Sequence, residues 1–389
     1  MTSKHRGKNE GSVFQLPSGK WRAQVNQAGN RVSKNTSTKA EALAWIRKMQ
    51  THMDQGFDLE GSLITVEEYL PEWLENRKLS LRDKTAFQYS KIIKNHILPF
   101  IGKVRLRDLK LQGIEQYYSQ LIQAGRGVRT IRIVHNILHG SLEKAVRYGL
   151  VMYNPTIGAT LPRYHHEEMK VLEENQVIQF LIAAQDSPHY ALFYIAITTG
   201  MRMGELFGLK WSDIQWFAGA IHVQRQIQYV PGHGRCFVET KTKAGNRTIK
   251  LGEGSLDVLR HHKEYQEMQK NRAGDRWREQ ELVFPTSVGT PGDASNIRLD
   301  LNRILDSANL PRVRFHDLRH TAASLLLNNK IPVIVVSQML GHSKPSVTLD
   351  IYAHVFHDTQ GEAARMMDKL VTPILVEIPP VKQKATKNR

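Results

Sequence analysis

A block of helical sequence from Thr65 to about Asn154-Pro155 constrains the fold of this chain more than any other feature. It opens with Thr65-Val66-Glu67-Glu68, a capping box in which the threonine and the second glutamate satisfy the first turn of a helix. Apolar residues at helical spacing then predict four helices, at 65–77, 83–97, 110–123 and 128–148. We therefore expect residues 61–166 to form an all-α bundle, with a linker at 156–171.

The residues before this block have the pattern of short strands. Glycine and asparagine turns separate three predicted strands, at 12–16, 21–26 and 31–35. In the second strand apolar side chains alternate with basic and amide ones, so one face can pack while the other stays polar. A capping box at Thr38 predicts a helix that covers the apolar face. Residues 1–60 are thus a β-β-β-α module, which serves stability alone or also enters a DNA groove.

The last part of the chain mixes helix and strand signals. Apolar helices are predicted at 177–184 and 191–199, strands at 219–228, 237–240 and 247–251, and helices almost throughout beyond Leu256. Residues 167–373 should form a mixed, mainly α domain with a small antiparallel sheet, followed by a basic tail at 374–389. Its last helix, 359–371, packs on its own domain or docks on a neighbouring copy. The whole chain is predicted to be a multidomain α/β protein.

Charge is distributed unevenly between these parts. The 389 residues contain 54 Lys and Arg against 37 Asp and Glu, for a net charge of +17. Residues 1–166 hold 26 basic and 13 acidic residues, whereas residues 167–373 hold 24 and 23. The N-terminal half therefore has the electrostatic character of a polyanion-binding surface, although lysines that only keep a surface soluble would give the same count.

Several classes of protein are excluded by what the sequence lacks. The single cysteine, Cys236, cannot form an intramolecular disulfide or a cysteine-rich zinc module. No apolar run is long enough for a membrane helix, and no hydrophobic stretch follows the N-terminal charges, so we expect neither a membrane anchor nor a signal peptide. A cytoplasmic protein is expected.

Three short segments of the last domain stand out, each with an ordinary explanation. They are Thr199-Gly200-Met201-Arg202-Met203-Gly204-Glu205-Leu206, His316-Asp317-Leu318-Arg319-His320-Thr321, and Leu340-Gly341-His342-Ser343 with Tyr352 ten residues after the histidine. Arg202 could be a surface arginine paired with Glu205. Tyr352, beside Ile351, could be an ordinary packing residue.

The spacing of His316 and His320 is that of two metal ligands on a helix. A zincin helix, however, has a glutamate after its first histidine, where this chain has Asp317, and Arg319 would be an unfavourable neighbour for a cation. We therefore expect no metal, and we interpret His320 as a packing or capping histidine.

Taken together, these segments resemble the catalytic domain of the tyrosine recombinases, the integrases of phages and mobile elements. The resemblance covers about residues 170–357 and rests on the order, local sequence and spacing of the motifs. It implies that Arg202 and Arg319 clamp the phosphate, that His316 and His342 are catalytic, and that Tyr352 is the nucleophile. The family also uses a lysine in a β-hairpin. Here Lys241 is favoured because it continues the predicted strand, and Lys243 remains an alternative.

These residue types suit phosphoryl transfer on general grounds. Two guanidinium groups can cancel the charge of the non-bridging oxygens without a metal. A tyrosine hydroxyl needs a proton acceptor, for which His316 is our candidate, while His342 would bond the phosphate or the tyrosine. The hairpin lysine would protonate the leaving 5′ oxygen.

By the resemblance, Tyr352 forms a 3′-phosphotyrosyl link and frees a 5′ hydroxyl that attacks the partner strand. Bond energy is conserved, so no cofactor is needed, and the sequence has neither a Walker-type glycine loop nor an acidic Mg²⁺ cluster. The implied partners are core-type and arm-type duplex attachment sites, a homotetramer passing through a Holliday junction, and an excisionase or host DNA-bending protein. The implied setting is the nucleoid of a bacterial host.

Five further residues are our candidates for contacts to DNA. Arg22 and Arg31 lie in the predicted strands, and Lys84, Lys91 and Arg129 lie on the predicted bundle. Two other functions remain open at this point, a type IB topoisomerase and a DNA-binding regulator that has the fold without the activity.

Overall fold

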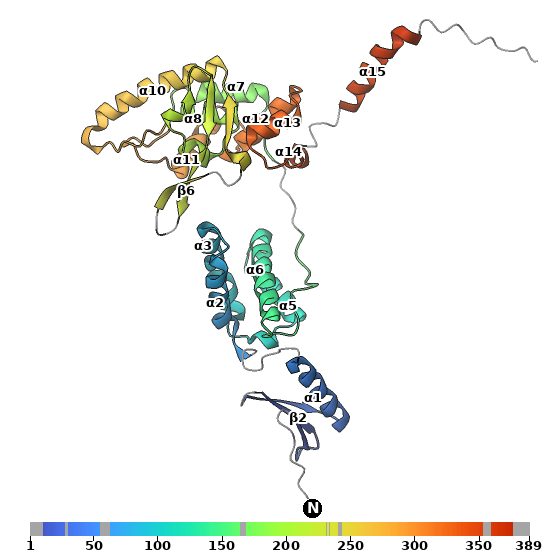
Figure 1. Cartoon of the computed structure of the whole chain (residues 1–389). Coiled ribbons are helices and arrows are strands. Elements are labelled where there is room, and N and C mark those ends of the chain that lie inside the picture. The colour runs from blue at the N-terminus through green and yellow to red at the C-terminus, as the bar shows by residue number, and fades with distance from the viewer. Residues whose placement is uncertain are drawn as a thin grey trace, which may run out of the picture. The chain divides into compact units, whose positions relative to one another are not determined.

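The computed structural model of the chain describes residues 11–27, 30–54, 63–163, 169–230, 232, 234–239, 243–352 and 359–375 (Figure 1). The chain divides into two compact units, Met1–His166 and Glu167–Arg389. Among the helices of these ranges, none combines the length and the apolar character that crossing a bilayer requires.

The first unit begins with the predicted β-β-β-α module. Strands β1 (Ser12–Gln15), β2 (Trp21–Gln27) and β3 (Asn30–Thr36) form an antiparallel sheet in that order, and helix α1 (Lys39–Asp54) packs on it. The small core combines two β2 residues with three from α1; it contains Ala23, Val25, Ala42, Ile46 and Met49. The Thr38 hydroxyl caps α1 by accepting a bond from the Glu41 N–H at 3.2 Å, but the Glu41 carboxylate bonds the N–H of Ser37 instead of completing the box.

The same unit contains the helical bundle, with helices close to those predicted. They are α2 (Val66–Lys78), α3 (Asp83–Ile92), α4 (Leu98–Ile101), α5 (Leu111–Gln123) and α6 (Val128–Arg147). The Thr65 box is complete, with the Glu68 carboxylate 2.8 Å from the Thr65 N–H. The predicted second helix is interrupted by a π-helical turn, η2 (Ile93–Ile97), because Pro99 lacks the N–H that a regular α-helix would use there.

The second unit is the mixed, mainly helical domain. Its helices are α7 (Glu174–Ala183), α8 (Tyr190–Thr199), α9 (Met203–Phe207), α10 (Glu253–Ala273), α11 (Ala294–Ser307), α12 (Phe315–Asn328), α13 (Val333–Leu340), α14 (Pro345–Tyr352) and α15 (Thr359–Leu375). Strands β4 (Ile214–Gln215), β5 (Ala220–Val223) and β8 (Arg247–Lys250) form one antiparallel sheet, and β6 (Arg225–Val230) and β7 (Gly234–Glu239) form a separate hairpin. Residues 277–293 are not helical, although we expected helix there.

The single strand predicted at 219–228 is two strands in different sheets. The break falls at Gln224, where the Gln224 amide and the Arg225 guanidinium both bond the buried carboxylate of Asp213. Burying a carboxylate requires such partners, so the chain turns from one sheet into the other at this point.

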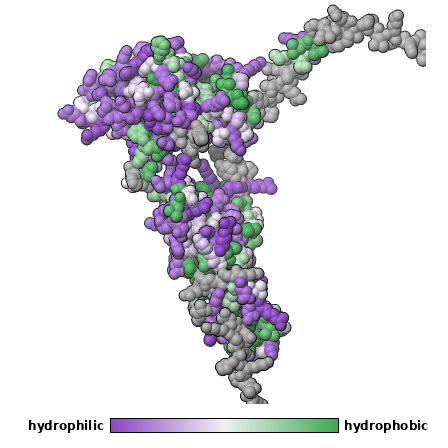
Figure 2. Space-filling view, viewed as in Figure 1, coloured by the Kyte–Doolittle hydropathy of each residue, from purple (hydrophilic) through white to green (hydrophobic). Residues whose placement is uncertain are grey.

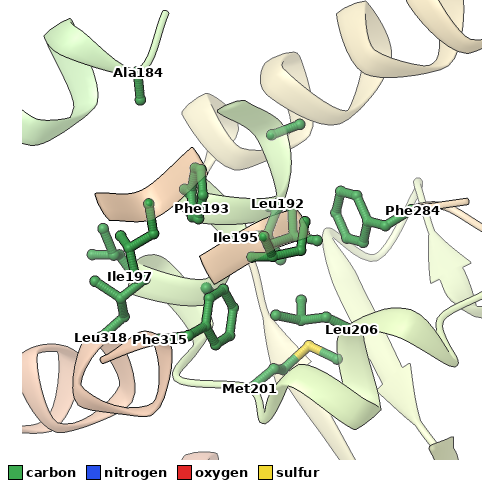
Figure 3. Packing of buried hydrophobic residues seen from close by; sticks show 14 of the residues in the cluster. Ala184, Leu192, Phe193, Ile195, Ile197, Met201, Leu206, Phe284, Phe315 and Leu318 are labelled. Carbon is green, nitrogen blue, oxygen red and sulfur yellow. The ribbon is translucent and has the colours of Figure 1, made fainter. Parts of the chain in front are cut away.

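The core of this unit surrounds α8, which is apolar on nearly every side. Figure 3 shows that Met201 and Leu206, before and within α9, and Phe315 and Leu318 of α12 belong to this same core. Each pair flanks residues of a motif found in the sequence. The apolar residues therefore anchor the turns that carry the polar ones.

Candidate active site

Arg202 lies on the turn between α8 and α9. Gly200 ends α8 with a left-handed φ of 62°, and Met201 is buried behind it. Arg202 is the N-cap of α9, and both its N–H (3.0 Å) and its Nη1 (2.8 Å) donate to the Glu205 carboxylate. The Arg202 side chain remains 37% exposed, so its other donors face outward.

Glu205 is almost completely buried between two arginines. Besides Arg202, it accepts bonds from Arg247 Nη1 at 3.3 Å and Nη2 at 3.0 Å. Burial alone would raise the pKa of the Glu205 carboxyl, but the charges of Arg247 and Arg202 outweigh it and hold the pKa below its usual value. The carboxylate is therefore ionised and fixes both guanidinium groups.

Arg319 reaches the same place from helix α12. Its side chain is buried, and its Nη1 donates to the carbonyl of Gly200 at 2.8 Å. Its Nη2 has no hydrogen-bond partner among the described residues. Burial and the charge of Arg202 lower the pKa of Arg319 to about 9, so the guanidinium stays charged at neutral pH. A buried cationic donor without a partner is suited to receive an anion.

His342 follows the end of helix α13. Gly341 terminates the helix with a φ of 71°, and a side chain there would lie within 2.9 Å of Arg247 Nη1 and within 2.8 Å of the Ala244 carbonyl. His342 Nδ1 is 2.8 Å from the Thr348 hydroxyl. Burial, then Arg319 and Arg202, lower the pKa of His342 to about 4, so the ring is neutral at pH 7.

Tyr352 is the last residue of α14 and is 1% exposed. Its hydroxyl lies 2.7 Å from Nδ1 of His320, not against His316 or His342. Burial raises the pKa of Tyr352 to about 12, against a smaller lowering by Arg319. The interpretation of His320 as only a packing or capping residue is therefore incomplete. The tyrosine hydroxyl, one of the two partners expected for His342, bonds His320 instead.

His316 lies on α12, four residues before His320. It is partly exposed to solvent, and its ring meets that of His320 edge-on, with the centroids 5.0 Å apart. Partial burial, then Arg319 and Arg202, lower the pKa of His316. Burial and the charge of His316 lower that of His320 to about 4. The cluster of Arg202, Arg319, His316, His320, His342 and Tyr352 is thus strongly cationic around neutral histidines.

Two expected lysines are not placed at this cluster. Lys241 lies outside the described residues, and Lys243 begins the short helix η5 (Lys243–Gly245), where its side chain is not described. The backbone of Ala244 nevertheless lies against Gly341, as noted above. No three His, Cys, Asp or Glu side chains of the described ranges converge as metal ligands would.

The five candidate DNA contacts all lie in the first unit. Arg22 is on the face of β2 opposite α1, beside Phe14 of β1 and bonded at 3.0 Å to Asn35 of β3. Arg31 is exposed at the end of the same face. On the bundle, Lys84, Lys91 and Arg129 are exposed, and Lys91 lies over the ring of Phe87.

Sequence reasoning misses two residues of the site. The spacing of His320 suggests only a metal ligand, and its contact with Tyr352 joins residues 32 positions apart that no local pattern connects. In the sequence, Arg247 looks like an ordinary first residue of a strand. The only signal available for Arg247 is an arginine just after the Lys-rich hairpin, at the start of a short strand.

Comparison with known proteins agrees with this fold. The family model of the phage integrase family matches residues 170–358, and that of the phage integrase N-terminal SAM-like domain matches residues 65–122. A "Tyrosine recombinase XerC-like" protein of Caldanaerobacter subterraneus is 30% identical over 352 residues, covering 86% of this chain and 90% of the relative. The ICEBs1 integrase of Bacillus subtilis is 24% identical over 371 residues, and the match covers 92% of this chain and 100% of the relative.

Solved structures show the same fold. The Tn1549 transposon integrase in complex with transposon right end DNA superposes with a TM-score of 0.68 at 21% identity, over 79% of this chain and 99% of that one. A lambda integrase dimer bound to a COC′ core site gives 0.58 at 17% identity, over 89% and 96%.

The fold and its match to these models define a DNA strand transferase of the tyrosine type. The chain belongs to the phage integrase family of tyrosine recombinases, and its activity is site-specific DNA recombination. The resemblance noted in the sequence, over residues 170–357, is thereby confirmed.

Proposed function

We propose that Tyr352 breaks one DNA strand by attacking the scissile phosphate, which forms a 3′-phosphotyrosyl bond and releases a 5′ hydroxyl. The observation that carries this proposal is the buried Nη2 of Arg319, which has no partner in the described chain and belongs to the same cationic cluster as Tyr352. A phosphodiester oxygen would satisfy it. Arg202, whose free donors face outward, would clamp the second non-bridging oxygen.

Protons must leave the tyrosine and reach the departing oxygen. His320 Nδ1 is in hydrogen-bond contact with the Tyr352 hydroxyl and can accept its proton, with His316 as the adjoining acid-base group. His342, whose Nδ1 is bonded to Thr348, would donate a hydrogen bond to the phosphate from the N–H of its other ring nitrogen. Lys241 or Lys243 would protonate the 5′ oxygen, and the packing of Ala244 against Gly341 supports a lysine near His342.

The DNA would be held by three domains and a basic tail. Residues 167–373 would act as the catalytic domain and residues 61–166 as the core-binding domain, with Lys84, Lys91 and Arg129 on phosphates. Residues 1–60 would bind arm-type sites through Arg22 and Arg31, and the basic tail at 374–389 would add charge. The known complexes of lambda integrase and Tn1549 integrase with DNA support duplex attachment sites as the substrate.

Recombination would take place in a homotetramer. A lambda integrase tetramer is known on a Holliday junction, and its fold matches this chain with a TM-score of 0.55. Helix α15 would help assembly by docking on a neighbour, since Met366, Met367 and Leu370 are exposed on it (Figure 2). Bacterial relatives support action at the nucleoid of a bacterial cytoplasm, where an excisionase or a DNA-bending protein would set direction.

A nicked attachment site tests the proposed chemistry. The site would first be found by selecting duplexes that the full-length chain binds, and the nick would let the short 5′ fragment diffuse away after cleavage. Denaturing electrophoresis should then show a covalent protein–DNA adduct, followed by strand exchange with a second site. An adduct without strand exchange, together with relaxation of a supercoiled plasmid in a parallel assay, would indicate topoisomerase chemistry. DNA binding without any adduct would indicate a regulator.

Cleavage should also proceed without a metal ion. Two guanidinium groups supply the charge that Mg²⁺ supplies in many phosphoryl transfers. We therefore expect the same adduct yield in EDTA as in Mg²⁺, measured at a salt concentration where DNA binding is equal. Loss of cleavage with intact binding would contradict the proposed clamp.

A further inference from the structure

Arg247, the first residue of strand β8, ties together three segments that carry the motifs. Its Nε donates to the Met339 carbonyl at the end of α13 at 2.6 Å, and its Nη1 donates to the Gly245 carbonyl after the hairpin at 3.2 Å. Both Nη atoms also bond the two oxygens of Glu205. The Arg247 side chain is 7% exposed, and all three of its guanidinium nitrogens already bond protein oxygens, so unlike Arg319 it has no unpartnered nitrogen to offer a phosphate.

The charges of this group explain what Arg247 can do for the site. The Glu205 carboxylate carries one negative charge and is shared by two guanidinium groups, so Arg202, Glu205 and Arg247 together carry one net positive charge. Without Arg247, Glu205 would neutralise Arg202 alone. The most exposed member of the trio would then have no surplus charge for an incoming phosphate.

Geometry adds to this effect. Glu205 Oε2 accepts both the Arg202 N–H and Arg247 Nη2, and Oε1 accepts Nη1 of each arginine. The carboxylate plane is therefore fixed from both sides. If the bonds from Arg247 are removed, the Glu205 carboxylate can rotate, and the Arg202 side chain bonded to it moves as well.

We propose that Arg247 is a positioning residue, which holds Arg202 in place and keeps its charge available to the scissile phosphate through the buried carboxylate of Glu205. The proposal rests on the role given above to Arg202. It adds a residue that touches neither DNA nor Tyr352 but on which the strength of the phosphate clamp depends.

The test uses a substrate whose phosphate no longer needs that clamp. In a methylphosphonate, a methyl group replaces one non-bridging oxygen of the scissile phosphate, so the charge that Arg202 cancels is absent. Single-turnover cleavage of nicked sites would be compared on phosphate and on each methylphosphonate stereoisomer, for the wild type and for Arg202→Ala, Arg247→Met and Arg247→Lys.

We expect Arg247→Met to cleave the phosphate on the order of 100-fold more slowly than the wild type, the cost of a misplaced catalytic group. On the stereoisomer that restores Arg202→Ala, it should regain at least tenfold of that loss. Arg247→Lys should be intermediate on phosphate, because an ammonium keeps Glu205 paired but cannot make all four bonds. If the methionine variant does not fold, the lysine variant carries the comparison.

Arg225→Met is the matched control. Arg225 pairs with the 2%-exposed Asp213 in the same unit, so its loss also leaves a buried carboxylate without its arginine. We expect this variant to keep the wild-type ratio of methylphosphonate to phosphate cleavage, whatever its stability.

Other results would overturn the proposal. It fails if Arg247→Met cleaves phosphate at the wild-type rate, or if it stays slow on the methylphosphonate that restores Arg202→Ala. If no stereoisomer restores Arg202→Ala, the role of Arg202 is wrong, and the double variant decides about Arg247. Equal rates for Arg202→Ala and Arg202→Ala/Arg247→Met support the coupling between the two residues, and multiplied losses refute it.

Discussion

At the scale of single residues, the Tyr352 hydroxyl is the atom on which the proposed chemistry depends. Tyr352→Phe removes only that oxygen, so we expect the variant to bind its site with unchanged affinity and to form no covalent adduct. Binding would be measured by gel shift and adduct by denaturing electrophoresis. Tyr229→Phe, at a tyrosine that is 62% exposed on the β6–β7 hairpin, is the control and should keep the adduct. An adduct that persists in Tyr352→Phe would refute the assignment.

The histidines of the site make folding depend on pH. Burial holds the pKa of His320 and of His342 at about 4 in the folded chain, against about 6.5 when unfolded. Below pH 6.5 the unfolded chain therefore binds protons that the folded chain does not, and stability falls as the pH drops from 6.5 towards 4.

Urea unfolding of the second unit should give a lower free energy of unfolding at pH 5 than at pH 7.5. His342→Gln should reduce the difference between the two values, because one of the groups that take up protons on unfolding is gone. The exposed His261→Gln is the control and should leave the difference as it is in the wild type. An unchanged difference in His342→Gln would contradict the explanation.

At the scale of elements, Arg202, His342 and Tyr352 lie at helix ends, whereas His316, Arg319 and His320 lie in the first two turns of α12. Gly200 shows why this arrangement is rigid. A Cβ atom there would lie 2.5 Å from Leu340 Cδ2 of α13, so the turn carrying Arg202 and the end of α13 before His342 are in direct contact. Only glycine allows both that approach and the left-handed φ.

Gly200→Ala should therefore destabilise the second unit by more than the left-handed conformation alone costs, which is about 1–2 kcal/mol. The matched control is Gly125→Ala in the bundle, which has a φ of 70° and nothing within 4 Å of the added carbon. We expect denaturant unfolding to show a larger loss for Gly200→Ala, together with slower cleavage. Equal losses of stability for the two variants would mean that Leu340 of α13 can move away from the added carbon without a loss of free energy.

The elements themselves are largely predictable, because each rests on a local signal. The Thr65 box, the turn at Gly19 and the apolar spacing of α6 each involve residues close in sequence, and the structure has those elements within a residue or two. The π-helical turn before Pro99 and the strand break at Gln224 are not predicted. The π-helical turn depends on the N–H that Pro99 lacks, and the strand break depends on the buried Asp213. Neither changes the periodicity of apolar residues along the sequence.

The site divides in the same way. Arg202, Arg319, His316, His342 and Tyr352 are indicated by the motifs that carry the family resemblance, and the structure brings all of them into one cluster. The contact of His320 with Tyr352 and the bonds of Arg247 to Glu205 and Met339 are not, since each joins segments separated by 30 residues or more. Such contacts follow from how helices and strands pack, which a single sequence does not specify residue by residue.

At the scale of the whole molecule, we expect the basic first module to be dispensable for cleavage. A fragment beginning at Gly61 keeps the bundle and the second unit, so it should cleave a nicked core site as the full chain does but fail to recombine sites that carry arm sequences. Filter binding should also give full-length protein the steeper dependence of log K on log salt, by roughly 0.9 for each phosphate that the module neutralises. Equal recombination by the fragment would show that residues 1–60 do not bind arm sites.

Within that module, Arg22→Ala should weaken binding to arm DNA without loss of folding, because its side chain leaves the polar face while the core of Ala23 and Val25 is untouched. Trp21→Ala is the contrasting variant, since Trp21 packs against that core and its loss should lower the melting temperature of the module. Weakened binding only in Trp21→Ala would place the DNA contact elsewhere.

The burial of Tyr352 has a consequence for the cell that carries this protein. An enzyme able to cut any duplex it touched would endanger the chromosome on which it must search for one short site. Under the proposed chemistry, Tyr352, which is 1% exposed in the free chain, would not reach a duplex during the search, and only a site whose binding energy exceeds the cost of exposing it would be cut. Selectivity would then be exerted at the moment of cutting as well as at the moment of binding.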